Sequence, residues 1–169
     1  METPVDVRIR EIFVAHGPAL LLYARQWLDR PAAQDVVQDV FVRLIASGRL
    51  PREPRTWLFR CVRNAAISAC RSHGRRGRRE HAAVRPAVSA EWFAPRLDDR
   101  IDAEAAQQAL ETLPPVQREI VALRIWSGLT LAQVAQVTGR PISTLHDQYR
   151  SALKSMRERL EQTCKSNGH

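Results

Sequence analysis

The chain has few cysteines, few aromatic residues and no long apolar segment, and these absences narrow its class. Its 169 residues include three cysteines, at positions 61, 70 and 164. Cys61 and Cys70 would lie on opposite sides of one helix, about 13 Å apart along its axis, so they cannot form a disulfide. Without a CxxC pair or a close Cys/His cluster, a zinc site is not expected either. A reducing cytoplasm suits this composition best.

Membrane-spanning and secretory segments are also missing. No apolar run approaches the roughly 18 residues that a transmembrane helix needs. The N-terminal sequence METPVDVRIREIF alternates charges and lacks the apolar core of a secretory signal. A clustered carboxylate pair, a P-loop and a set of metal ligands are absent, and the five histidines are scattered. The sequence therefore argues against an enzyme, a metal site, a cofactor, a small-molecule substrate and membrane insertion.

Positive charge is what the chain has in excess, and one block of sequence holds it. The net charge is +8. Residues 49–85 contain eleven arginines and two acids, residues 1–48 contain five cations and six acids, and residues 86–169 contain ten of each. A solvated surface helix would mix the two signs. Nucleic acid is the partner that this block favours, and an anionic protein or membrane surface is the alternative.

The patterned segments are nearly all helical, because alternating strand-type runs are absent and Gly and Pro fall between segments. The expected helices of the first half are about Val5–Leu28 (with a break near Gly17-Pro18), Pro31–Ala46 and Arg55–Arg71. Those of the second half are Ile101–Leu113, Pro114–Ser127, Leu131–Thr138 and Ile142–Gln162. The stretch Ser72–Arg100 has no clear period and is interpreted as a linker. The sequence predicts an all-α protein of two small helical domains joined by a flexible linker.

The segment Thr130–Leu160, TLAQVAQVTGRPISTLHDQYRSALKSMRERL, has the pattern of a helix-turn-helix. Thr130 and Gln133 have the spacing of a capping box. Gly139 falls where the tight turn needs a residue without a Cβ, and Pro141 suits the first turn of the next helix. An ordinary two-helix corner in an all-α protein is the alternative interpretation.

The second helix of this motif has an apolar inner face and a polar outer face. The inner residues recur at three- and four-residue steps: Ile142, Leu145, Tyr149, Ala152 and Met156. The outer residues are Ser143, Thr144, His146, Asp147, Arg150, Ser151 and Lys154. Short polar groups near a helix start, with cations further on, suit the DNA major groove and its phosphates. Asp147 either accepts from a cytosine amine or pairs with Arg150 one turn on, and the pair is slightly favoured.

The helix expected over residues 31–46 has an acidic, amide-bearing face. Its buried stripe is Val37, Val40, Phe41 and Leu44. Its outward face contains Asp35, Gln38 and Asp39. Such a face in a basic protein is poorly suited to DNA and well suited to a basic or polar protein surface. A solvated face without a partner is the equal alternative.

The basic helix and its flanks read PREPRTWLFRCVRNAAISACRSHGRRGRRE. The residues that can pack inward are Trp57, Leu58, Cys61, Val62, Ala65 and Ile67. Core packing is favoured for Trp57, and stacking on a base is the alternative. Arg60, Arg63, Asn64, Ser68 and Arg71 lie on or beside one outer face. Asn64, the only amide on this helix, either reads a base edge or makes an ordinary hydrogen bond on the helix surface.

An arginine run follows that helix. It contains Arg75, Arg76, Arg78 and Arg79, separated by glycine, and it is suited to tracking phosphates without reading sequence. Further on, Trp92 and Phe93 stand together in unpatterned sequence. Two adjacent aromatic residues in such a segment usually dock on another surface, and docking on one of the chain's own domains is one interpretation.

Three segments together resemble bacterial sigma factors of the sigma-70 superfamily. DVVQDVFVRL is similar to the helix with which these proteins bind core RNA polymerase, and PRTWLFRCVRNAAISACR resembles the helix that melts and reads the minus-ten promoter element. LPPVQREIVALRIWSGLTLAQVAQVTGRPISTL resembles the C-terminal domain that binds the minus-thirty-five element. The segments stand in the family's order. The short length and two domains are similar to the extracytoplasmic-function (ECF) group.

The resemblance implies a role for each part of the chain. Residues 1–71 would bind core polymerase and the minus-ten element, residues 72–100 would be the linker, and residues 101–164 would bind the minus-thirty-five element. The implied polymerase contacts are Asp35, Gln38 and Asp39. The implied minus-ten contacts are Trp57, Arg60, Arg63, Asn64, Ser68, Arg71, Arg75 and Arg76. The implied minus-thirty-five contacts are Ser143, Thr144, His146, Asp147, Arg150 and Lys154.

The chain also departs from the family's pattern. Ser68 stands where many relatives carry Asp. Gln148, Ser151 and Leu153 stand where Arg is frequent, which predicts an unusual minus-thirty-five sequence or a weak contact there. Elsewhere the pattern is kept, because Arg118 and Glu119 match the pair that opens the second helix of the C-terminal domain. In the family, the linker threads into polymerase, which is the second interpretation of Trp92 and Phe93.

The function that these motifs predict is that of an ECF sigma factor. The partners it implies are core RNA polymerase, promoter DNA and an anti-sigma factor, which commonly holds members of that group. The alternative is a stand-alone helix-turn-helix transcriptional regulator. Such regulators typically dimerise on two half-sites, and the sequence has no heptad or other clear dimer stripe.

Overall fold

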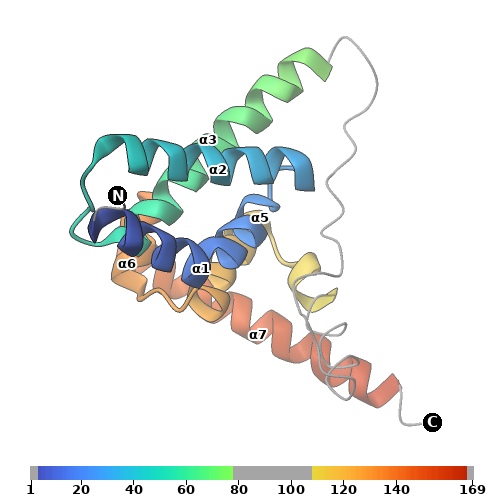
Figure 1. Ribbon diagram of the computed structural model, residues 1–169. Helices are drawn as coiled ribbons and strands as arrows, with labels where there is room; N and C mark the ends of the chain where they lie inside the picture. Colours follow the sequence, from blue (N-terminus) through green and yellow to red (C-terminus); the bar gives the residue numbers. More distant parts are fainter. Residues whose placement is uncertain (1–3, 78–107, 167–169) are drawn as a thin grey trace. The chain divides into compact units, whose positions relative to one another are not determined.

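The structure is a computed structural model that describes residues 4–77 and 108–166, with side chains over 4–72 and 108–162. All regular structure in these two ranges is helical, as Figure 1 shows. The chain divides into two compact units. The N-terminal unit is built around the helices before residue 78, and the C-terminal unit from most of the residues after 107. The prediction of an all-α protein with two helical domains is confirmed.

The N-terminal unit consists of three long helices, α1 (Pro4–Ala24), α2 (Arg30–Ser47) and α3 (Pro54–Gly77). Each of the three packs against the other two. Tyr23, Leu44 and Phe59 are fully buried in their core, and the Tyr23 and Phe59 rings meet edge to face with centroids 5.4 Å apart. The predicted α2 stripe of Val37, Val40, Phe41 and Leu44 is buried. This unit therefore has the apolar core that its periodicity predicts.

The break expected in the first helix near Gly17-Pro18 is wrong, because α1 continues through both residues. Gly17 is buried beneath Phe13, whose ring lies 3.8 Å from where a Cβ would stand. The Phe13 ring also packs edge to face on Phe41 of α2, at 4.9 Å between centroids. An interior proline costs a helix about 3 kcal/mol, and burial of this helix against α2 and α3 offsets that cost.

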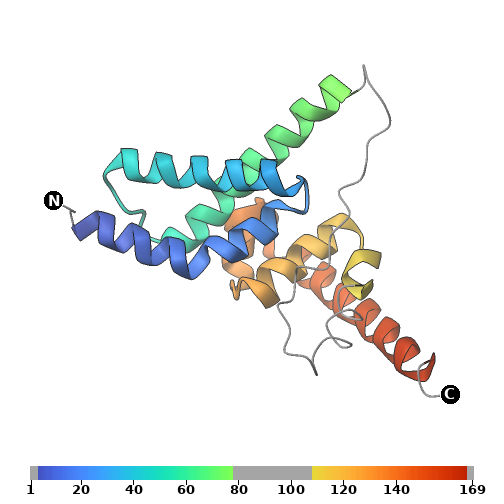
Figure 2. The same cartoon turned by 45° about the vertical axis from the view of Figure 1, so that its right-hand side comes forward.

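The helix α3 differs from its prediction in length and in phase. It ends at Gly77 rather than near Arg71, and Figures 1 and 2 show its last turns extending beyond α1 and α2. Its fully buried residues are Leu58, Phe59, Val62 and Ala66, whereas Trp57, Cys61, Ala65 and Ile67 are only half-buried. The inward residue next to Leu58 is therefore Phe59 and not Trp57. Partners on α1 and α2 decide which of two neighbouring aromatic residues is covered.

The C-terminal unit contains α5 (Pro115–Val121), a π-helical turn η3 (Ala122–Trp126), α6 (Leu131–Thr138) and α7 (Ile142–Ser166). The predicted helix over 114–127 is present, but it changes from α to π at Ala122, where Ser127 N–H donates to the Ala122 carbonyl at 3.1 Å. The helix expected from Ile101 is described only from residue 108. The helix α5 packs against α7.

The helix-turn-helix is confirmed in its details. Thr130 N–H donates to Gln133 Oε1 at 2.9 Å, and Gln133 N–H donates to Thr130 Oγ1 at 3.2 Å, which completes the capping box. Gly139 has φ +70°, a left-handed conformation that favours glycine. The helix α7 begins directly after Pro141. In α7, Leu145, Ala152 and Met156 are buried and Tyr149 is half-buried, but Ile142 is 46% exposed and is not an inward residue.

Candidate nucleic-acid interfaces

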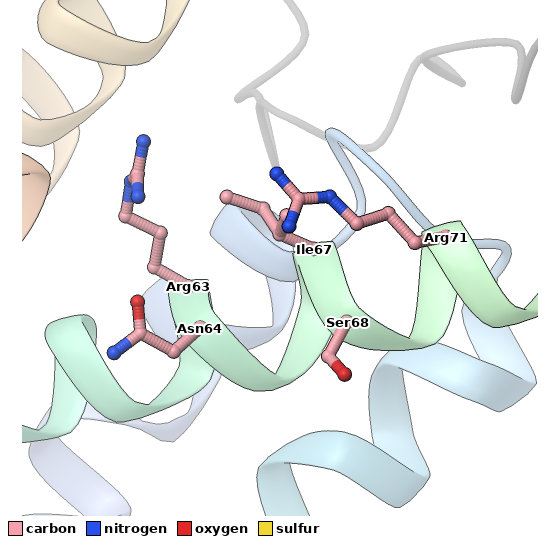
Figure 3. Close-up of a pocket in the computed structure, with 5 residues that line it drawn as sticks. All are labelled: Arg63, Asn64, Ile67, Ser68 and Arg71. Atoms are coloured by element: carbon pink, nitrogen blue, oxygen red, sulfur yellow. The ribbon is translucent and has the colours of Figure 1, made fainter.

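The outward face of α3 carries an open pocket of about 380 Å³. Its lining residues, drawn in Figure 3, are Arg63, Asn64, Ile67, Ser68 and Arg71. The Arg71 side chain runs back along the helix toward Ile67, and Ser68 points to the other side of α3. Two guanidinium groups, one amide and one apolar side chain are thus brought to the same surface. Such a set can bind phosphate, a base edge and a base face.

Helix geometry places two of these pocket residues in line with Trp57 along one side of α3. Trp57, Asn64 and Arg71 follow one another at seven-residue spacing, which places them within about 20° of each other around the helix axis at each step. Asn64, Arg71 and Arg60 are exposed, and Trp57 is half-buried. The predicted face is therefore present from Trp57 to Arg71, and Trp57 borders it rather than filling the core.

The rest of the predicted basic face is described only in part. Arg75 and Arg76 belong to α3, but their side chains lie outside the described residues. Arg78, Arg79, Trp92 and Phe93 lie outside them entirely.

The charge of a cation on α2 also acts on α3, and little in the sequence indicates that the two are near each other. Burial raises the pKa of the Cys61 thiol, while the nearby charges of Arg60 and Arg43 act in the opposite direction. Arg43 therefore lies near the α3 turn that holds Cys61. The one signal in the sequence is that Arg43 is the single cation between Arg30 and Arg49. Both cysteines of this helix, Cys61 and Cys70, are free thiols, as predicted.

The outward face of α7 presents a continuous polar stripe. Ser143, His146, Asp147, Arg150 and Lys154 are all exposed, and each lies three or four residues from another member of the set, so all five share one side of the helix. Thr144 is exposed as well, but its spacing places it on a different side of the helix, in line with Gln148 and Ser151. Lys154 lies 4.0 Å from Glu158 in an exposed pair. Among the described residues Asp147 forms no ion pair with Arg150, so the pair expected there is not present.

Side chains of α5 and η3 hold α7 on two sides. Gln117 Nε2 donates to Gln148 Oε1 at 3.1 Å and to Ser151 Oγ at 3.3 Å. The Arg124 guanidinium lies 5.6 Å from the centroid of the Tyr149 ring and also donates to the Leu129 carbonyl. Polar contacts therefore supplement the apolar stripe in fixing the position of α7.

Arg118 and Glu119, which match a pair in the resembled family, are engaged within the C-terminal unit. The Arg118 guanidinium donates to the carbonyls of Leu110, Glu111 and Leu113, at 3.2, 2.7 and 3.1 Å. It thereby caps the C-terminal end of the preceding helix with side-chain donors. Glu119 is buried, with 4% of its surface exposed.

Both polar surfaces fall within segments that match known families. The Sigma-70 region 2 model matches residues 12–76, and the Sigma-70, region 4 model matches residues 103–156. Together the two matches span more than half of the chain. The chain belongs to the sigma-70 family. The two regions and the relatives below identify it as a sigma factor of the ECF type.

Individual relatives agree with this assignment. The sigma factor is 26% identical over 131 residues to RNA polymerase sigma factor SigV of Bacillus subtilis (strain 168), covering 76% of this chain and 75% of that protein. Its fold is similar to the sigma factor RpoE from Bartonella quintana, solved with the anti-sigma factor NepR, with TM-score 0.66, 24% identity and coverage of 91% and 97% of the two chains. It is also similar to CnrH, solved with the cytosolic domain of CnrY, with TM-score 0.59, 22% identity and coverage of 91% and 88%.

The remaining predicted surface lies on α2. Asp35, Gln38 and Asp39 are all exposed there, on one side of the helix. Val42 and Ile45 continue the same side toward the helix end, with 62% and 53% of their surface exposed. The sequence interpretation missed this apolar continuation. Its signal was the placement of Val42 four residues after Gln38, with Ile45 three residues further.

None of the helices in the described ranges is long and apolar enough to cross a membrane. No group of three or more His, Cys, Asp or Glu side chains in those ranges could hold a metal ion.

Proposed function

We propose that this sigma factor divides polymerase binding and promoter recognition among three helices. As a sigma factor it binds core RNA polymerase and directs transcription from promoter DNA. In the proposal, α2 contacts polymerase, α3 holds the opened minus-ten element and α7 reads the minus-thirty-five duplex. Residues 1–71 and 101–164 are the two functional domains and 72–100 the linker, with α3 continuing to Gly77.

The single observation that carries the minus-ten assignment is the pocket on α3. Arg63 and Arg71 supply cations for phosphates, and Asn64 supplies a paired donor and acceptor for a base edge. Ile67 adds an apolar surface beside them, and Trp57 lies on the same line of the helix for stacking. Opening a base step costs a few kcal/mol, which contacts of this kind offset. Arg60, Ser68, Arg75 and Arg76 complete the proposed minus-ten set.

The polymerase assignment is supported by the chemistry of the exposed α2 face. Asp35, Gln38 and Asp39 give it two carboxylates and an amide, while Val42 and Ile45 give it apolar area. An apolar patch beside a polar rim is typical of protein interfaces, and two carboxylates would repel a phosphate backbone. The proposed contact set is therefore protein-binding and not DNA-binding.

The minus-thirty-five assignment is supported by the exposed stripe on α7. Ser143, His146, Asp147, Arg150 and Lys154 lie along one side of a helix that follows the tight turn of a helix-turn-helix. Such a helix enters the major groove with its N-terminal residues against base edges. Thr144, on a neighbouring side, is assigned to the groove wall. Asp147, which is not paired with Arg150, is left to accept from a cytosine amine.

Further parts of the proposal come from relatives. One similar structure holds the sigma factor RpoE with the anti-sigma factor NepR, and another holds CnrH with the cytosolic domain of CnrY. An anti-sigma factor is accordingly proposed for this chain, together with a cytoplasmic location. The chain is proposed to act without catalytic groups or cofactors, since binding contacts alone supply the energy for promoter opening.

Transcription in vitro tests the proposal directly. Bacterial core polymerase would transcribe fragmented genomic DNA with and without the protein, and the 5′ ends would be mapped. New start sites that share two upstream motifs are the expected result. An absence of new starts, together with sequence-specific duplex binding by the protein alone, would instead establish a stand-alone helix-turn-helix regulator.

A further inference from the structure

One side of α7, next to the reading stripe, holds a small network of uncharged polar groups. Gln117, on the first turns of α5, donates from Nε2 to Gln148 Oε1 and to Ser151 Oγ, at 3.1 and 3.3 Å. These partners lie 31 and 34 residues from Gln117 in the sequence. Gln148 is half-buried and Ser151 is exposed. We call Gln117, Gln148 and Ser151 the amide edge of α7.

The network leaves the N–H donors of Gln148 and the O–H donor of Ser151 available on its outer side. A primary amide has two N–H donors and one carbonyl oxygen, and a hydroxyl has one donor. Because the Gln148 oxygen is occupied by Gln117, its Nε2 group is directed away from that contact. In the described part of the chain, neither Gln148 Nε2 nor the Ser151 hydroxyl donates a hydrogen bond to another residue. The edge thus offers oriented, uncharged N–H and O–H groups.

The edge borders the stripe that is assigned to the DNA groove. Ser151 lies four residues after Asp147 and three residues before Lys154, so it touches the stripe's margin on the helix surface. When a helix lies in the major groove, the middle of its groove-facing side meets base edges, and the flanks of that side meet the phosphates of the groove walls. Base edges present both donors and acceptors, whereas phosphate oxygens only accept. Oriented N–H and O–H donors at the margin can donate to a phosphate oxygen there.

Contacts on the opposite side of α7 also fix this helix, so the amide edge cannot rotate away from the direction that it faces. Arg124 lies over the Tyr149 ring on the side of α7 away from Gln117, and between these two sides Leu145 and Ala152 are fully buried. Rotation of α7 about its axis would break Gln117–Gln148 on one side or Arg124–Tyr149 on the other. The side chains of the edge are therefore preorganised.

From this geometry we propose that Gln148 and Ser151, oriented by Gln117, bind one backbone phosphate of the upstream promoter duplex through uncharged hydrogen bonds. This inference rests on the proposed function, because it takes α7 as the helix that binds the minus-thirty-five element. Gln148 and Ser151 touch the DNA, and Gln117 is a positioning residue. The contact releases no counterion, because no cation is involved.

Holoenzyme binding to a promoter fragment mapped by transcription tests the proposal. Gln148→Ala lowers affinity by about tenfold, the effect of a hydrogen bond to a charged group, and leaves the salt slope unchanged. Gln148→Arg makes the slope of log K against log salt steeper by about 0.9, the value for one neutralised phosphate. Gln108→Ala, an exposed glutamine of the same unit, changes neither quantity.

The role of Gln117 is tested by combining variants. Gln117→Ala lowers affinity by about threefold because it leaves the donors present but unoriented. It has no further effect on affinity in a Gln148→Ala, Ser151→Ala background, because the two side chains that Gln117 orients are then absent. Effects of Gln117→Ala and Gln148→Ala that multiply would overturn the positioning role. Melting curves of each variant separate loss of contact from loss of fold.

The phosphate itself is located with methylphosphonate substitutions along the upstream duplex. At one position, the neutral phosphonate should remove the affinity difference between the native protein and Gln148→Ala. If the difference persists at every position, or if Gln148→Ala binds as tightly as the native protein, the amide edge does not bind phosphate. Failure of the proposed function looks different: Arg150→Ala would then also leave binding unchanged, and no fragment would depend on its upstream motif.

Discussion

The outward faces of α3 and α7 are assigned to the same polymer, yet they are built from different chemistry. The block around α3 contains eleven arginines against two acids, whereas residues 86–169 carry ten charges of each sign. The pocket on α3 gathers Arg63, Arg71 and Asn64. The stripe on α7 mixes His146, Asp147 and Arg150. One face is dense in charge, and the other is nearly balanced.

The difference follows from what each face is proposed to hold. A melted strand is flexible and exposes base faces and edges, so its capture needs cations along the backbone and flat or amide groups beside them. A duplex presents an ordered groove, so oriented hydrogen bonds can replace charge. Under this proposal, net charge identifies the face that captures the melted strand, but it does not identify the face that reads the duplex.

The largest effect is expected from a substitution that unfolds the C-terminal unit, which carries the α7 face, and leaves the α3 face intact. Leu145→Asp should unfold the C-terminal unit at a cost of at least about 4 kcal/mol, because Leu145 is fully buried and an unpaired charge would take its place. Thermal melting of the full chain, followed by circular dichroism, should lose helicity in part and keep the N-terminal unit's transition. His146→Asp, at the exposed neighbour, is the control. A native melting curve for Leu145→Asp would remove the helix-turn-helix assignment.

A third surface separates DNA binding from polymerase binding. Replacing Asp35, Gln38 and Asp39 together by Ala should weaken core polymerase binding by about a hundredfold, the scale of interface hot spots. Helicity should stay unchanged because all three side chains are exposed. Replacing Glu158, Glu161 and Gln162 by Ala removes the same groups from α7 and serves as the matched control. Equal affinities in a core-binding titration would eliminate the α2 role.

The distinction between strand capture and duplex reading is sharpened by Asn64. Asn64→Ala should reduce open-complex formation by about tenfold, the value of a base-edge hydrogen bond, and leave closed-duplex binding nearly unchanged. Permanganate footprinting of the promoter measures the first quantity, and filter binding at low temperature the second. Cys70→Ala, an exposed change on the same helix outside the pocket, should alter neither. Unchanged permanganate reactivity in Asn64→Ala would count against the pocket.

The smallest effects are expected on the free energy of unfolding, from substitutions of glycines in the turns of the two units. Gly48 and Gly139 have φ of +61° and +70°, and no atom outside the two adjacent residues lies within 4 Å of the position that a Cβ would take. Because only the backbone conformation opposes a side chain there, Ala at either position should destabilise its unit by about 1 kcal/mol. Gly17→Ala is the control of opposite sign. Its site is helical and its nearest neighbour stands 3.8 Å away, so Ala should stabilise by about 0.5–1 kcal/mol. Chemical denaturation of the full chain measures all three.

Several predictions from the sequence depended only on neighbours along the chain, and these agree with the structure. The start of α6 rests on Thr130 and Gln133, three residues apart, and its end on the left-handed Gly139. The exposed side of α2 follows from three- and four-residue spacing. Where the local pattern allowed two outcomes it failed, as with Trp57 against Phe59 and with Ile142, because packing partners decided the phase.

The sequence by itself determined the helical class, the helix-turn-helix, the family resemblance and most polar residues of each outward face. Those properties arise from side-chain periodicity, caps and turn residues, which act over a few positions. Only the tertiary structure decided that α1 continues through Pro18, that Arg43 lies near Cys61, and that Gln117 holds Gln148 and Ser151 from 31 and 34 residues away. Contacts over that distance depend on which helix faces meet, and packing of the whole unit sets that pairing.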